Sequence, residues 1–365
     1  MNTFKTSLIL ILILSGCSPE KEGLPGNEFE SFLSELPVIE VRHISSLDEI
    51  SYGNYLVERF STDKLITAEA QVWRLHLVDF TGNLIATAGG MGRGPGEFSV
   101  INQIHVGLDN RVYVLDRQLQ RISVFSVSGD NFIFEKIMIL PDYSPLILDG
   151  LYLTSSGFAG VFRNRATTSN DDQVFRVFSL DNELNLNEEL FEMAGNDVIR
   201  RDGRVIADNV FGQITHWQVY DDRLFYTRSA DFSVTEFHFI NKTSSTVDIP
   251  EIPGRYMNNQ IVSDLEERFL QMIQMMPELS EFIQEGESLP GFVNFAVHQN
   301  RYFFTLFDVM NSSDEGVILV FDKDQDEWNK ISVPSGFTLY GAYGDILFGI
   351  NHAENNNTLT IIGIN

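Results

Sequence analysis

Residues 109–125 read Asp-Asn-Arg-Val-Tyr-Val-Leu-Asp-Arg-Gln-Leu-Gln-Arg-Ile-Ser-Val-Phe, and this stretch contains the pattern that decides the fold. A polar pair and a basic residue precede one apolar run, and a second alternating run begins at Arg121. A short polar turn between two alternating runs is typical of a β-hairpin. Similar turns lie at 62–66, 221–225 and 299–303, and weaker ones at 148–152 and 343–347.

A second hairpin follows most of these turns. Its first strand alternates apolar and polar residues at 73–78, 121–125, 175–178, 234–239 and 317–321. Four of these strands run into a further turn, at 81–83, 128–130, 180–182 and 322–324. Four antiparallel strands per repeat make one propeller blade. The sequence therefore predicts an all-β protein, a six-bladed β-propeller of four-stranded antiparallel blades over residues 37–365. A β-sandwich with extra strands is the alternative, but it would not produce six spaced copies of one unit.

The sixth repeat, residues 337–365, contains only three predicted strands. The apolar alternation at 38–44 lies before the first complete repeat. We expect this N-terminal segment to supply the missing fourth strand, because pairing there would remove two open sheet edges.

Residues 89–129 resemble one NHL repeat. They contain Gly92-Arg93-Gly94-Pro95-Gly96-Glu97-Phe98, followed by the hairpin at 109–116 and the strand at 121–125. The whole chain resembles the six-bladed propeller lipoproteins of Bacteroidetes-type bacteria. Blades three to six lack the second glycine-rich entry of the NHL consensus. The resemblance therefore implies a fold and a compartment, and it implies little about activity.

Residues 1–17 resemble a lipoprotein signal peptide. Lys5 precedes a pure Leu/Ile run at 8–14, and Leu14-Ser15-Gly16-Cys17 resembles a lipobox. The run is shorter than the roughly 20 residues that span a bilayer. Cys17 is the single cysteine of the chain, so it is the expected lipidation site, and the lipid would be the contact with the membrane.

Residues 18–36 are weakly patterned and predict a flexible tether. Ser18, directly after the lipidation site, favours the outer membrane by analogy with enterobacterial sorting. We therefore expect a protein that is lipid-anchored to the bacterial outer membrane, either periplasmic or at the cell surface.

The charge is strongly acidic, with 51 Asp and Glu against 25 Lys and Arg and a formal net charge of -26. Such a field repels phosphate backbones, so nucleic acid is excluded as an expected partner. A solvated acidic surface explains the composition, and a cationic partner or divalent cations would be the functional alternative.

The long connections point to one face. If the first strand of each blade runs down the channel, the connections between blades and those between second and third strands lie above. The insertions at 89–98, 157–172, 195–212, 253–290 and 308–316 all fall on this upper face. Because long loops in a compact domain are often functional, we expect a protein, peptide or glycan ligand there. The candidate ligand-binding residues are Arg93, Glu97, Phe98, Asn102, His105, His216, Trp217 and Asn294.

The longest insertion, at about 255–288 between blades four and five, is predicted to be helical. Ser263-Asp264-Leu265-Glu266 has the form of a capping box. Apolar residues at helical spacing surround it, and Pro277 interrupts them. They are Ile261, Leu265, Phe269, Met272, Ile273 and Met276.

No motif of a known catalytic class is present, so the sequence favours binding over catalysis, without a cofactor. His105, His216 and His298 lie on predicted inner strands, where the related propeller lyases hold a metal. Their strand positions do not bring them together. The alternative function is a divalent-metal-dependent channel enzyme of lyase or lactonase type. The acidic turn at 322–326 has alternating carboxylates that suit calcium, although a solvated turn is the interpretation we prefer.

Overall fold

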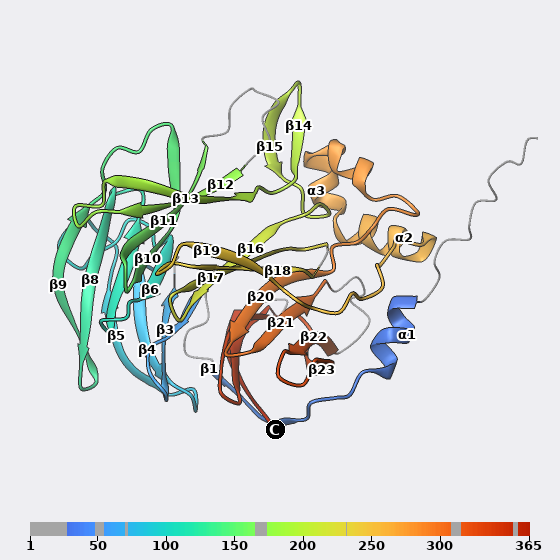
Figure 1. Ribbon diagram of the computed structural model, residues 1–365, viewed down its shortest axis with the longest axis horizontal. Coiled ribbons are helices and arrows are strands. Elements are labelled where there is room, and N and C mark those ends of the chain that lie inside the picture. Colours follow the sequence, from blue (N-terminus) through green and yellow to red (C-terminus); the bar gives the residue numbers. More distant parts are fainter. Residues whose placement is uncertain are drawn as a thin grey trace, which may run out of the picture.

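The computed structural model describes residues 28–47, 55–69, 72–164, 174–230, 232–307, 315–352 and 357–365. Within them, six four-stranded antiparallel sheets surround a central axis (Figure 1). The predicted six-bladed β-propeller is confirmed. The predicted signal peptide, including Cys17, lies outside the described residues.

The first three blades each run in chain order from the innermost strand outward. Blade one comprises β2 (Tyr55–Arg59), β3 (Lys64–Glu69), β4 (Arg74–Asp79) and β5 (Leu84–Gly89). Blade two comprises β6 (Gln103–Val106), β7 (Arg111–Asp116), β8 (Arg121–Ser128) and β9 (Asn131–Ile139). Blade three comprises β10 (Leu146–Thr154), β11 (Gly157–Asn164), β12 (Val174–Leu180) and β13 (Leu186–Ala194).

The last three blades are separated by two insertions. Blade four comprises β16 (Thr215–Tyr220), β17 (Arg223–Arg228), β18 (Val234–His238) and β19 (Thr243–Val247). Blade five comprises β20 (Phe292–His298), β21 (Arg301–Leu306), β22 (Glu315–Asp322) and β23 (Glu327–Pro334). Blade six comprises β24 (Phe337–Tyr343), β25 (Ile346–His352), β26 (Asn357–Ile364) and β1 (Val41–Leu47).

The N-terminal strand closes the ring as predicted. β1 pairs antiparallel with β26, in a register that places Ile44 opposite Ile362. It begins three residues later than the predicted segment. Val38 instead bridges Lys330 of β23 in blade five. The N-terminal chain therefore joins blade five to blade six before it becomes the outermost strand of the latter.

The tether prediction is wrong for residues 28–35, which form helix α1 (Glu28–Glu35). Phe29 is 4% exposed and belongs to the apolar cluster of blades four and five. Phe32, Leu33 and Leu36 pack against the same cluster. These four residues follow the i, i+3, i+4, i+7 spacing of one helical face, so the signal was present in the sequence.

The predicted hairpin turn at 148–152 is also wrong, because these residues lie inside β10. Asp149 forms ion pairs with Arg117 and Arg163, both at 2.9 Å, and Gly150 follows a register shift in the strand. The real turn follows Thr154, so residues 157–164 are strand β11 and not an upper-face loop. An Asp-Gly pair that resembled a turn is instead a β-bulge.

Six apolar clusters fill the spaces between neighbouring blades. Each contains side chains from two adjacent sheets, so the core is a ring around the axis. A seventh cluster lies outside the ring, in the insertions before and after blade four. The insertions thus have a small core of their own.

Hydrogen bonds also link the innermost strands around the axis. A polar side chain from one inner strand bonds to the backbone of the next, which satisfies backbone groups that have no neighbouring strand. The pairs are Glu58 with Val106 (2.9 Å), Gln103 with Leu151 (2.7 and 3.1 Å), Gln218 with Val297 (2.6 Å) and Asn294 with Leu339 (2.5 Å).

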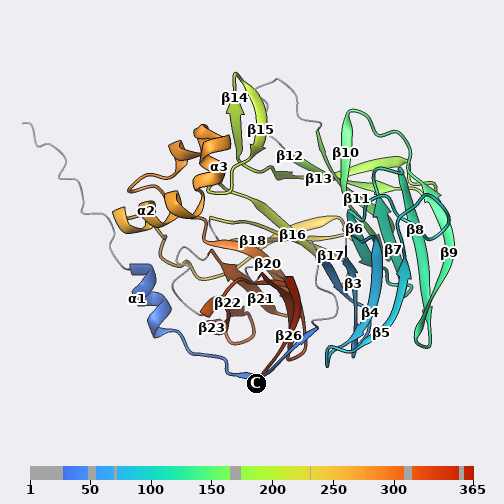
Figure 2. The same ribbon diagram turned by 180° about the vertical axis from the view of Figure 1, so that it is seen from behind.

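The predicted helical insertion comprises α2 (Asn259–Arg268), α3 (Leu270–Met275) and a 3-10 helix, η1 (Pro277–Phe282). Of the predicted apolar stripe, Ile261 and Leu265 are buried in the seventh cluster, and Phe269, Met272 and Ile273 pack against it. The start was predicted too late, because Asn258 caps α2 by accepting the N–H of Ile261 at 2.9 Å. Figures 1 and 2 show α2 and α3 beside a second insertion, the hairpin β14 (Val198–Arg201) and β15 (Arg204–Asp208).

Candidate ligand-binding site

The glycine-rich loop between blades one and two folds around two side chains. Glu97 accepts the N–H of Gly94 through Oε2 at 2.7 Å. Arg121 donates to the carbonyls of Arg93, Gly94 and Glu97 at 2.9, 2.9 and 2.6 Å. The backbone carbonyls of this loop therefore point to a buried guanidinium, and the loop is closed on itself.

Phe98 ends this loop and is fully buried in the cluster between blades one and two. Its ring lies 6.0 Å from the ring of Phe125. A Cβ on Gly89, which has a φ of +93°, would meet the Phe98 ring and the Trp73 carbonyl, each at 2.7 Å. Gly89 is therefore needed for the close packing of the backbone against Phe98. The Phe98 side chain is surrounded by protein atoms.

Asn102 and Asn294 both bond to protein backbone. Asn102 accepts the N–H of Arg117 at 2.8 Å. Asn294 donates to Leu339 and accepts the N–H of Phe295 at 2.8 Å. Their amide groups therefore fix the backbone near the inner strands β6 and β20.

His105 and Trp217 are brought together through Tyr152. The His105 ring meets the Tyr152 ring edge-on at 5.2 Å, and Trp217 Nε1 donates to the Tyr152 hydroxyl at 2.9 Å. His105 Nδ1 lies 3.1 Å from Glu58 Oε1. Burial raises the pKa of Tyr152 above its usual range, so this hydroxyl stays protonated and serves to join blades three and four.

The three inner-strand histidines lie in separate environments. Burial lowers the pKa of His216 to about 4, and its ring lies 5.4 Å from that of Phe292. The His298 ring lies between Tyr220 and Tyr343, at 5.3 and 5.1 Å. Over the described part of the chain, no group of three or more His, Cys, Asp or Glu is arranged to hold a metal ion.

In the acidic turn at 322–326, the carboxylate of Asp322 is engaged within the protein. It accepts the N–H groups of Asp324 and Gln325 at 3.0 and 3.3 Å, and the Arg301 Nε at 3.0 Å. The geometry is that of a turn stabilised by its own aspartate.

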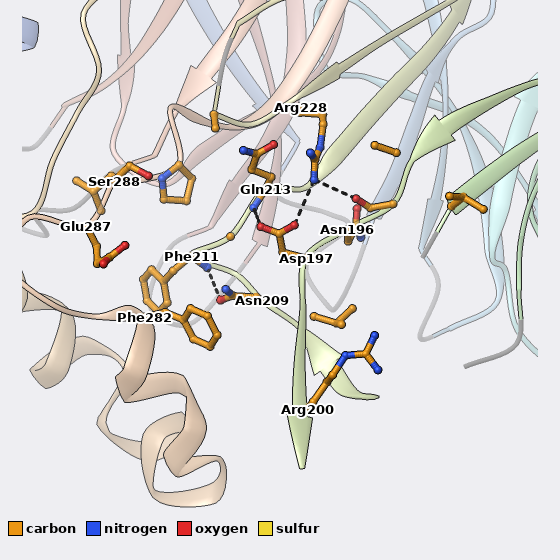
Figure 3. A pocket seen from close by; sticks show the side chains of 18 residues that line it. Asn196, Asp197, Arg200, Asn209, Phe211, Gln213, Arg228, Phe282, Glu287 and Ser288 are labelled. Carbon is orange, nitrogen blue, oxygen red and sulfur yellow. Dashed lines mark hydrogen bonds and ion pairs between the residues drawn. The ribbon is translucent and has the colours of Figure 1, made fainter. Parts of the chain in front are cut away.

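A pocket of about 700 Å³ lies elsewhere on the upper face, between blades three and four. Figure 3 shows its side chains, which come from the connection 194–213, from residues 228–230 at the end of β17, from residues 282–290 and from Val174 at the start of β12. None of the eight predicted ligand-binding residues lines it. As ligand contacts those eight stay a prediction, and the pocket is a second, independent candidate site.

One wall of the pocket is polar and fixed in place. Asp197 accepts the Gln213 N–H at 2.9 Å and lies 3.2 Å from Arg228 Nη2. Arg228 also donates to the Gly195 carbonyl at 3.3 Å. Asn209 is 2% exposed and accepts the Phe211 N–H at 3.1 Å. These bonds set the direction of each polar group before any ligand arrives.

The hairpin β14–β15 and the helical insertion pack against each other and form a cap next to the pocket. Ile199 of the hairpin is buried with Leu265 and Leu279 of the helices in the seventh cluster. Arg201 also makes a bidentate ion pair with Glu278, at 2.5 and 2.8 Å. The hydrogen bonds and the charge of Arg201 lower the pKa of Glu278 to about 2. The hairpin and the helices are therefore one unit over the pocket.

The sequence contained a usable signal for this hairpin. Apolar residues at 198–199 and 205–207 flank Asp202-Gly203, and an Asp-Gly pair at this position favours a two-residue hairpin turn. Both residues have positive φ, at 51° and 75°. Arg228 had no comparable signal, because its role depends on a contact with Asp197, 31 residues away.

Sequence comparison places the chain in one family. The family described as 6-bladed beta-propeller (DUF5128) matches residues 49–276. The chain belongs to this family. No curated protein matches the chain. No helix among the described residues is long and apolar enough to cross a membrane.

The solved structures that the chain resembles are distant in sequence. A putative exported protein from Bacteroides fragilis is 12% identical, with 90% of this chain and 96% of that chain covered and a TM-score of 0.49. A DUF4221 family member from Bacteroides vulgatus is 9% identical, with 90% and 97% covered and a TM-score of 0.49. Virginiamycin B lyase from Staphylococcus aureus is 9% identical, with 88% and 99% covered and a TM-score of 0.44.

Proposed function

We propose that this propeller is a ligand-binding lipoprotein of the outer membrane, and that it takes its ligand into the upper-face pocket between blades three and four. The observation that carries the proposal is the construction of this pocket. All of its lining residues lie at the upper ends of strands or in the connections above them. Most of its lining residues belong to two insertions that a closed propeller does not need.

The size and composition of the pocket support binding of a small ligand or of one end of a larger one. Ligand sites typically measure about 300–1,000 Å³ and combine apolar walls with a few fixed polar groups. Phe211 and Phe282 supply apolar surface, and Asp197, Asn209 and Arg228 supply the polar groups. Asp197 and Arg228 already bond to each other, and Asn209 bonds to the backbone of Phe211, which reduces the cost of ordering these groups on binding.

The membrane anchor rests on the lipobox at 14–17. A Cys17→Ala variant should lose all labelled palmitate, because the chain has no other cysteine. The variant should also leave the membrane fraction. Palmitate that still incorporates into the variant would contradict the lipoprotein proposal.

The pocket is tested by blocking it. Ser288 is an exposed residue on the pocket wall, so Ser288→Trp should fill the pocket with an indole and leave the blades intact. The purified domain, beginning at Asn27, is screened by thermal shift against a library of neutral oligosaccharides, short peptides and sulfated sugars. We expect at least one class to raise the melting temperature of the wild type and not that of the variant.

Ser155→Trp is the matched control. Ser155 is also exposed but lies in the turn between β10 and β11, at the opposite ends of the blades. It should respond to ligands like the wild type. A ligand whose effect is the same in all three proteins would place binding outside this pocket and would overturn the proposed site.

A further inference from the structure

The charges in the pocket indicate what kind of ligand fits it. Two basic residues, Arg200 and Arg228, and two acidic ones, Asp197 and Glu287, line it. Their charges cancel, in a protein with a formal net charge of -26. An anionic ligand would approach against the field of the whole protein, and a cationic one would meet the two arginines. A neutral polar ligand meets neither obstacle.

The polar wall offers donors and acceptors side by side. The Asp197 carboxylate accepts hydrogen bonds, and the adjacent Arg228 guanidinium donates them. The Asp197 carboxylate and the Arg228 guanidinium lie 3.2 Å apart. Two neighbouring ligand groups that can each donate and accept a hydrogen bond could therefore bond to both side chains. Vicinal hydroxyls have this property, since each hydroxyl carries one donor and two acceptor lone pairs.

The other side of the pocket is aromatic. Phe211 is 6% exposed, and its ring is held edge-on by Phe269 at 5.0 Å and by Phe307 at 6.1 Å. Phe282, half-buried at the end of η1, lies beside it in Figure 3, across the pocket from Arg228. The pocket is therefore apolar on one side and hydrogen-bonding on the other.

We propose that the pocket binds a neutral oligosaccharide, with the C–H face of a sugar ring on the Phe211 and Phe282 side and its hydroxyls at Asp197 and Arg228. The inference rests on the proposed function and adds the ligand class. A sugar ring has an apolar face and a polar edge, as the two walls require. A volume of about 700 Å³ suits a short oligosaccharide, because it lies inside the usual range for ligands larger than one ring.

The test is calorimetric titration of the purified domain with maltotriose, cellotriose, xylotriose and chitotriose. We expect one of them to bind, and Phe282→Ala to weaken that binding by at least tenfold through loss of the ring contact. Asp197→Asn should weaken it as well, while the amide oxygen keeps the bond to the Gln213 N–H. This second variant preserves the test if Phe282→Ala fails to fold.

Met275→Ala is the control within the same insertion. Met275 is 71% exposed and does not line the pocket, so it should bind the sugar like the wild type. Melting curves of all variants separate loss of binding from loss of fold.

The outcomes separate the ligand class from the site. If short peptides or sulfated sugars bind in a manner that Ser288→Trp abolishes and no neutral sugar does, the oligosaccharide proposal fails and the pocket proposal stands. If no compound binds in a Ser288-dependent manner, both fail. If a neutral sugar binds but Phe282→Ala and Asp197→Asn leave its affinity unchanged, the proposed binding geometry is overturned.

Discussion

The connection between blades one and two and the connection between blades three and four occupy equivalent places in the ring. Their polar groups are hydrogen-bonded in different ways. Each is anchored by an arginine from its neighbouring blade. Arg121 is 6% exposed and donates to three carbonyls of its loop. Arg228 donates to one carbonyl and to the half-exposed carboxylate of Asp197. The first connection satisfies its polar groups internally, whereas the second presents them to a pocket.

This difference changes how the most recognisable motif is interpreted. In the glycine-rich signature at 92–98, Arg93, Glu97 and Phe98 stay predicted ligand contacts, and the structure shows that the same segment packs closely between blades one and two. Phe98 fills the space between two blades, and Glu97 and Arg121 organise the backbone. The less regular connection at 194–213 leaves polar side chains available to a ligand.

The largest expected effect is loss of Phe98. Phe98→Ala should lower the free energy of unfolding by about 3–5 kcal/mol, because it leaves a cavity between blades one and two. Denaturant unfolding of the purified domain measures this. Met91→Ala, in the same loop but 74% exposed, should change the midpoint little. Equal effects of the two substitutions would show that the loop is not packed as described.

The second prediction concerns the buried arginine. Arg121→Met keeps the apolar stem but removes the donors to three carbonyls, and we expect a loss of about 2–3 kcal/mol in unfolding free energy. Arg111→Met, on the exposed end of the neighbouring strand, is the control and should have a much smaller effect. Hydrogen exchange should become faster at the N–H of Gly94, which Glu97 accepts in the closed loop. A loop that keeps its protection without Arg121 would contradict the closed description.

Features that depend on residues close together in the sequence were predictable, and features that depend on distant residues were not. Alternating strands and tight turns are local, so the six blades and the closure by β1 were predictable. The turn at 148–152 was misplaced because Asp149-Gly150 has turn chemistry locally, while ion pairs to Arg117 and Arg163 make it part of a strand. Helix α1 was missed although its apolar spacing is regular, because it lies in a polar stretch.

The site was less predictable, since its parts come from four separate segments. The sequence placed insertions at 195–212 and 253–290 on the upper face, and both contribute to the pocket. It could not show that Asp197 meets Arg228 or that Phe282 lies near Phe211, because these contacts depend on how the cap packs over blade four.

The third prediction addresses the open connection. Asp197→Ala removes the acceptor for the Gln213 N–H and the partner of Arg228, but both groups can reach water. We therefore expect a loss of only about 1 kcal/mol in unfolding free energy, well below that for Arg121→Met. The comparison of the two connections would be wrong if the Asp197 variant were the less stable protein.

The smallest expected effect is at the ion pair that joins the hairpin to η1. Both side chains are solvent-accessible, and exposed pairs contribute little to global stability, so Arg201→Ala should leave the melting temperature nearly unchanged. Its effect should be local, as faster hydrogen exchange in 198–208 and 277–282.

The pH dependence of this effect follows from the pKa of Glu278, which is lowered to about 2 in the folded protein. The contribution of the pair is therefore present above the usual glutamate pKa and is lost only as the pH falls toward 2. Exchange in these segments, corrected for its intrinsic pH dependence, should therefore be constant between pH 7 and pH 5 in the wild type, and the difference from Arg201→Ala should persist over that range. A difference that disappears already near pH 6 would show that some group other than Glu278 holds the cap, and the two insertions would then have to be treated as separate units.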